Sequence, residues 1–92
     1  MKQNEKVNEW TRQTALDGAY EEMHGIKPEV YLNRINQNIY KIKLIFGGKE
    51  IIITHELERN LSKNITLEYN GNKTNYKTHL DAELGANIIL RG

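Results

Sequence analysis

A hairpin signal at residues 38–57 constrains the fold of this chain more than any other feature of its sequence. Four large apolar residues occupy alternate positions between 40 and 46, which is the two-residue period of a half-buried strand. Gly47 and Gly48 follow, and glycine readily adopts the positive φ angles that a tight hairpin turn requires. Three β-branched isoleucines come next, so residues 39–46 and 49–57 are predicted to pair as antiparallel strands.

The second of these strands carries isoleucine on both of its faces. Ile51 and Ile53 point to one side, whereas Ile52 points to the other side, and Ile45 of the first strand adds a further apolar group. Burial of one isoleucine side chain contributes about 1.5–3 kcal/mol, so leaving Ile45 and Ile52 in water forgoes several kcal/mol. We therefore expect a cover for the second face: a loop, an end of the chain, a second copy of the chain or another protein.

The N-terminal part of the chain predicts a helix. Residues 5–23 contain good helix formers and no proline, and the apolar residues of the second half recur at helical spacing. We predict one helix with a kink near Gln13 and Thr14. The alternative is a break at that point, with Thr14-x-x-Asp17 capping a separate helix. Gly25 is expected to end the helix in the left-handed conformation.

Alternating apolar residues and turn signals predict five to six strands in total. The predicted strands span residues 29–35, 39–46, 49–57, 64–70, 73–80 and 87–91. One helix on an antiparallel sheet gives a single domain over residues 1–92 of the α+β class, and curling of the sheet into a small, partly open barrel is the variant of this fold.

Composition excludes several classes of protein. The chain has no cysteine, so it has neither a disulfide framework nor a thiolate metal site. Its net charge of +1 argues neither for nor against nucleic-acid binding. No apolar run approaches the length of a membrane span, and the polar N-terminus does not resemble a signal peptide, so we expect a cytoplasmic protein without a membrane partner. The abundance of Asn, Ile and Lys fits a gene from a low-GC bacterium, or from a virus or mobile element in one.

No catalytic constellation is recognised, so we expect no enzyme, no cofactor and no metal site. His55-Glu56 begins like a zinc-protease motif, but the second histidine that this motif requires is replaced by Arg59. The histidines are expected to be solvated or to lie at helix ends. Ser62 has no nucleophile elbow around it, and the close carboxylate pairs are interpreted as solvated surface.

The surplus of apolar side chains favours a non-catalytic protein-binding module, acting as a regulator, inhibitor or adaptor of another protein. The residues expected to bind are those without an assigned place in one small core: Val7, Trp10, Ile45 and Ile52. Tryptophan is enriched at binding hot spots, which supports Trp10 as an interface anchor. A homodimer that covers Ile45 and Ile52 is the expectation if no foreign partner covers them.

The second hypothesis is a nucleic-acid-binding protein that uses a lysine-bearing face of the sheet. The residues that would contact phosphate are Lys41, Lys43, Lys73 and Lys77. The aromatic residues that usually accompany such lysines for base stacking are assigned to the inner face of the sheet, and glutamates interrupt the basic strip. Nucleic acid therefore remains the alternative to a protein partner.

Overall fold

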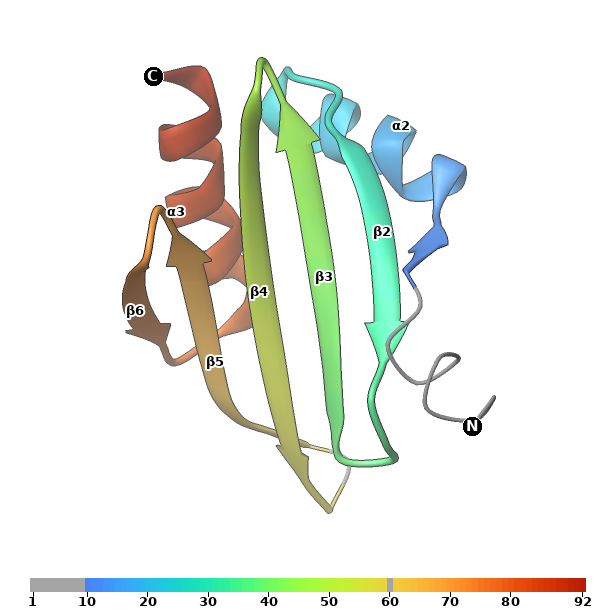
Figure 1. Cartoon of the computed structure of the whole chain (residues 1–92), viewed down its shortest axis with the longest axis vertical. Coiled ribbons are helices and arrows are strands. Elements are labelled where there is room, and N and C mark those ends of the chain that lie inside the picture. The colour runs from blue at the N-terminus through green and yellow to red at the C-terminus, as the bar shows by residue number, and fades with distance from the viewer. Residues whose placement is uncertain (1–9, 60) are drawn as a thin grey trace.

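The computed structural model describes residues 10–59 and 61–92. Within this part, a short strand and a helix precede five further strands, and a second helix follows them (Figure 1). The elements are β1 (Thr11–Arg12), α2 (Thr14–His24), β2 (Glu29–Arg34), β3 (Ile39–Phe46), β4 (Lys49–Glu58), β5 (Leu61–Tyr69), β6 (Asn72–Tyr76) and α3 (His79–Arg91). The predicted α+β class is confirmed, with a second helix that the sequence did not predict.

The six strands form one antiparallel sheet in which every strand pairs with its neighbour along the chain. At the predicted central hairpin, Gly47 and Gly48 have φ angles of 59° and 79°. Asn70 and Gly71 repeat this geometry between β5 and β6, with φ angles of 53° and 79°. Two consecutive positive φ angles match the twist of the flanking strands. Because β1 and β6 form the two edges, the sheet is open and does not close into a barrel.

One face of the sheet carries the hydrophobic core, and both helices lie on that face (Figure 1). Neighbouring strands contribute their inward residues in register, so that Ile42 lies opposite Ile53 and Leu44 opposite Ile51. The buried apolar residues from the strands are Val30, Ile42, Leu44, Ile51, Ile53, Ile65 and Leu67, and those from the helices are Tyr20, Ala82, Ala86 and Leu90. We call this side of the sheet the inner face and the opposite side, which neither helix covers, the outer face.

Helix α2 begins at Thr14, so the prediction of one continuous helix over residues 5–23 is wrong for residues 10–13. Thr11–Arg12 instead pairs with β2 as a short strand, and Gln13 is the N-cap residue. Residues 5–9 of the predicted helix lie outside the described residues. The alternative break near Gln13 is the correct interpretation, and Gly25 ends the helix with a φ of 81°, as predicted.

Asp17 does not cap α2, contrary to the predicted capping motif. Its carboxylate accepts two hydrogen bonds from the Arg12 guanidinium, at 2.9 and 2.7 Å. It also accepts one from the backbone N–H of Val30, at 2.9 Å. The side chain therefore ties the first turn of α2 to the backbone of β2, which explains why an acidic residue is buried there.

Helix α3 replaces the last predicted strand. The sequence predicted strands over residues 73–80 and 87–91, whereas β6 ends at Tyr76 and residues 79–91 are helical. Thr78 is the N-cap, and its hydroxyl accepts a hydrogen bond from the Asp81 N–H at 3.1 Å. Residues 88–90 are apolar at three consecutive positions, and such a short run does not distinguish a buried strand from a helix. The strand predicted over residues 87–91 is therefore wrong.

Gly85 brings α3 close to β6. A Cβ atom at this position would lie 2.8 Å from the Cζ atom of Tyr76, which is closer than side-chain carbons approach one another. Tyr76 is half-buried against the core, as the sequence predicted for this strand. Absence of a side chain at Gly85 therefore sets the distance between α3 and the edge of the sheet. No helix in the described part of the chain is long and apolar enough to span a membrane.

Candidate protein-binding surfaces

Three of the four residues predicted to bind protein lie together on the outer face. Ile52 pairs directly with Lys43 across β3 and β4, and Ile45 lies two residues further along β3 on the same side. The Trp10 ring lies next to this pair, with the Lys43 Nζ atom 4.4 Å from its centroid. We call Trp10, Lys43, Ile45 and Ile52 the outer patch. Val7, the fourth predicted residue, lies outside the described residues.

The outer patch is half-buried although no helix covers it. Trp10, Ile45 and Ile52 each keep part of their surface in solvent. A lysine ammonium above an indole ring gains about 0.5–1 kcal/mol at exposed sites, and its aliphatic stem shields apolar surface. The Lys43 side chain therefore covers part of the apolar surplus that the sequence predicted, which makes the outer patch less exposed than expected.

The lysines of the alternative hypothesis share the outer face with glutamates. Lys41, Lys43 and Lys73 have side chains on this face, while Lys77 follows β6 in the loop before α3. A row across four strands runs from Lys43 through Ile52 and Glu68 to Lys73. Opposite charges alternate in this row, so the positive potential that attracts phosphate is interrupted.

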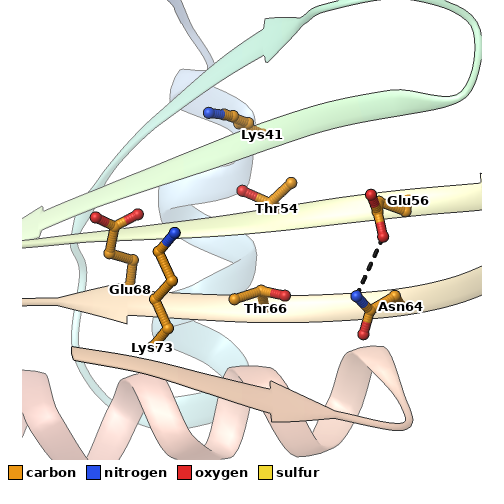
Figure 2. A pocket seen from close by; sticks show the side chains of 7 residues that line it. All are labelled: Lys41, Thr54, Glu56, Asn64, Thr66, Glu68 and Lys73. Carbon is orange, nitrogen blue, oxygen red and sulfur yellow. Dashed lines mark hydrogen bonds between the residues drawn. The ribbon is translucent and has the colours of Figure 1, made fainter. Parts of the chain in front are cut away.

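A polar depression of about 250 Å³ occupies the centre of the outer face (Figure 2). It is lined by Lys41, Thr54, Glu56, Asn64, Thr66, Glu68 and Lys73. Figure 2 shows side chains from β3 to β6 around it, and the Asn64 amide donates to Glu56 Oε1 at 3.1 Å. The two lysines and two glutamates leave this lining without formal net charge, and no apolar group anchors a ligand. The lining therefore does not favour a ligand of either charge or an apolar ligand.

The most exposed apolar residues of the described chain lie on helices, and three of them follow one face of α3. Leu80, Leu84 and Ile88 are 50%, 46% and 72% exposed. Their spacing of four residues places them in one line along the helix, on the side away from the buried Ala82 and Ala86. We call Leu80, Leu84 and Ile88 the α3 stripe.

Sequence reasoning missed the α3 stripe because it placed Ile88 in a strand. Two signals were available. Thr78 followed three residues later by Asp81 is typical of a helix start, and the four-residue spacing from Leu80 onward is typical of one helical face. The alternating pattern of the strand predicted over residues 73–80 outweighed both of these helix signals.

The three histidines of the chain meet at the contact between the helices and β4, and two of them, His24 and His79, contact Glu83. His24 Nε2 lies 3.3 Å from Glu83 Oε1, and His79 Nε2 lies 2.5 Å from Glu83 Oε2. The His55 ring stacks on Tyr40, with a centroid distance of 4.5 Å, and tilts against His79 at 4.8 Å. His24 ends α2, as predicted, whereas His79 begins α3 although the sequence placed it in the strand predicted over residues 73–80.

His55 is fully buried, so the prediction of a solvated histidine is wrong at this position. Neither of its ring nitrogens has a hydrogen-bond partner. Burial, and secondarily the charge of His79, lower the pKa of His55 to about 4. Burial also raises the pKa of Tyr20 above its ordinary value, with the charge of Glu83 as the second cause.

Within the described residues, no group of three or more histidines and carboxylates has the geometry to hold a metal ion. The histidine cluster joins α2, β4 and α3. Comparison with known protein families, with curated protein sequences and with solved structures finds no match for this chain.

Proposed function

We propose that this protein is a non-catalytic binding module that acts on another protein as a regulator, inhibitor or adaptor. The observation that carries the proposal is the α3 stripe. Single apolar residues are common on protein surfaces, whereas a continuous apolar line on one helical face is typical of a helix that docks in a hydrophobic groove. Leu80, Leu84 and Ile88 have that arrangement, and each keeps about half or more of its surface in solvent.

The outer patch supports the same proposal as a second, weaker surface. Trp10, Ile45 and Ile52 are apolar and adjacent, but each is already half-buried and Lys43 lies over Trp10. Less apolar area remains to be removed from water there than on the α3 stripe, so less free energy of binding is available. We therefore expect the α3 stripe to be the principal contact and the outer patch to be secondary.

Nucleic-acid binding remains the less supported alternative. Lys41, Lys43 and Lys73 share one face, but Glu56 and Glu68 lie among them and cancel much of their potential. Tyr31 is the aromatic residue on this face beside Trp10, and it carries its own hydrogen bond to Glu29. Stacking of several bases would need more free aromatic rings than this surface offers.

The proposal is tested by affinity capture of partners from cells that express the protein, with nuclease treatment throughout. Four baits are compared: the unchanged chain, Leu84→Asp with Ile88→Asp, Trp10→Ala with Ile52→Asp, and Gln37→Asp with Asn72→Asp. We call Leu84→Asp with Ile88→Asp the stripe variant. The last bait is its control, because it adds the same two negative charges at exposed polar positions away from both surfaces. We expect one protein to be retained by the unchanged chain and by this control, and to be lost from the stripe variant.

The affinity of the purified pair then gives the quantitative measurement. The stripe variant should weaken binding at least about tenfold, because two apolar anchors are replaced by charges that would be desolvated. Raising the salt concentration should change the affinity little, whereas phosphate binding would fall steeply. Equal retention by all four baits, or loss of binding after nuclease treatment or after Lys41→Glu with Lys43→Glu, would contradict the proposal.

A further inference from the structure

The histidine cluster joins three elements that are distant in sequence. Glu83 of α3 is held by two imidazoles, since His24 from α2 contacts Oε1 and His79 from α3 contacts Oε2. His55 from β4 packs against His79 and not against the carboxylate. Every imidazole of the chain therefore lies within one contact region, on the inner face where α2 and α3 approach the sheet.

His55 differs from the other two histidines because it has no polar partner. It is fully buried, and both of its ring nitrogens are unpaired. A buried polar group without a partner is uncommon and costs free energy, which rises sharply if the group becomes charged. The His55 ring stacks on that of Tyr40, with an angle of 3° between the two ring planes.

The groups around His55 offer no place for a positive charge. From β3, Tyr40 covers one ring face, and the Arg34 guanidinium lies 5.6 Å from the Tyr40 ring centroid. From β5, the apolar Ile65 pairs with His55 across the strands. From α3, His79 presents a second imidazole.

The one carboxylate in the cluster is already engaged. Both oxygens of Glu83 are occupied by His24 and His79. The remaining neighbour from α2 is Tyr20, whose ring lies 5.4 Å from that of His24 and whose hydroxyl is buried without a partner. A proton on His55 would meet no free acceptor and would be repelled by the charge of His79.

We infer that His55 and the His24–Glu83–His79 bridge form an acid-sensitive latch, in which protonation of His55 releases α3 from the sheet. The inference goes beyond the proposed binding function, because it concerns the stability of the surface and not its partner. Release of α3 would take Ala82 and Ala86 out of the core and would carry the solvent-facing α3 stripe away from the rest of the molecule together with the helix.

The sign of the pH dependence follows from the pKa of His55. Its pKa is about 4 in the folded chain and 6.5 as the ordinary value. The full stability is therefore present above pH 6.5 and declines as the pH falls toward 4, because only the unfolded chain binds the proton over this range. Linkage predicts that the unfolding equilibrium constant rises roughly 20-fold between pH 7 and pH 5 from this residue alone.

The test compares the unchanged chain with His55→Phe and His24→Gln. Phenylalanine keeps a ring between Tyr40 and His79 but cannot take a proton, whereas His24→Gln removes an imidazole from the same cluster and leaves His55 in place. Urea unfolding at pH 7 and pH 5, with hydrogen-exchange protection of the α3 amides, gives the readout. We expect the unchanged chain and His24→Gln to lose stability and α3 protection at pH 5. For His55→Phe, the rise of the unfolding equilibrium constant between pH 7 and pH 5 should be roughly 20-fold smaller.

Two results would overturn the inference. One is a parallel loss of stability in His55→Phe and the unchanged chain between pH 7 and pH 5. The other comes from NMR titration of the histidine rings of the unchanged chain, which needs no variant to fold: protonation of His55 near pH 6.5 without a change in the α3 amides would exclude a latch. Stabilisation of the unchanged chain by added Zn²⁺, abolished in His55→Phe, would replace the latch by a metal site.

Discussion

Helices α2 and α3 cover the same face of the sheet, but different chemistry holds them there. Helix α2 is tied to the edge of the sheet by a charged side chain, since Asp17 accepts hydrogen bonds from Arg12 and from the Val30 backbone. Helix α3 is held by close packing of small residues, with Ala82 and Ala86 fully buried. Helix α2 thus relies on a few directional contacts with the sheet, whereas α3 relies on the shape of its inner side together with the bridge from Glu83 to His24 and His79.

The two helices also differ on their solvent sides. Helix α2 exposes the consecutive acidic residues Glu21 and Glu22, beside the apolar Met23. Helix α3 exposes Leu84 and Ile88 in line with Leu80. A helix needs one apolar face to pack on a sheet, and α3 has two such faces. Helix α2 exposes two large apolar residues, Leu16 and Met23, whereas α3 exposes three in one line, which is why the proposed function rests on α3 and not on α2.

Among changes that remove an existing contact, the largest effect is expected where the charged attachment of α2 is broken. Asp17→Ala leaves the Val30 N–H and the Arg12 guanidinium without their acceptor, and we expect the free energy of unfolding to fall by about 2–4 kcal/mol. Asp17→Asn keeps one acceptor and should cost less. Glu22→Ala, an exposed control on the same helix, should change stability by less than about 0.5 kcal/mol. Urea unfolding at pH 7 measures all three, and equal effects of Asp17→Ala and Glu22→Ala would show that the attachment is unimportant.

The same attachment has a defined pH dependence. The hydrogen bond from Arg12, and then that from Val30, lower the pKa of Asp17 below its ordinary value of 3.8. Its contribution to stability is therefore present above pH 3.8 and is lost as the pH falls through the lowered pKa. This range lies below the one in which His55 acts, so the acid sensitivities of the two helices are separable in one titration.

The next largest effect concerns the close approach of α3 to β6. Alanine normally stabilises a helix relative to glycine by about 1 kcal/mol, but at Gly85 its Cβ would collide with the Tyr76 ring. We expect Gly85→Ala to lower the free energy of unfolding by about 1–2 kcal/mol because the ring must move. In a chain with Tyr76→Ala the collision is absent, so Gly85→Ala should become stabilising. A stabilising effect in both backgrounds would mean that the close approach does not constrain the packing.

Most of the sheet follows from the sequence because its signals are local. Alternation and the turn at Gly47-Gly48 predicted β3 and β4 within one residue of their observed ends. The same alternation placed Ile45 and Ile52 on one face, as the strand register confirms. Helix α3 was missed because its inward residues are mainly alanines, which give a weak hydrophobic period, while residues 87–90 resemble a strand.

The features that join distant parts of the chain could not be predicted. Nothing local in the sequence brings His24 and His79 to the same glutamate, or His55 against His79, since that depends on the order of helices around the sheet. The α3 stripe was lost together with the helix that carries it. Asp17 was assigned to a cap because its true acceptor role depends on Val30, thirteen residues away across the α2–β2 contact.

The smallest expected effect sharpens the contrast between the two faces of α3. Leu84→Asp with Ile88→Asp should change the free energy of unfolding much less than a change on the inner side of the helix, by about 1 kcal/mol or less, because Leu84 is 46% and Ile88 72% exposed. Ala86→Asp, on the inner side of the same helix, would bury a charge without a partner and should prevent stable folding. Thermal unfolding of both variants measures the difference. A large loss of stability in the stripe variant would mean that Leu84 and Ile88 support the fold, and the apolar stripe would then need no partner to explain it.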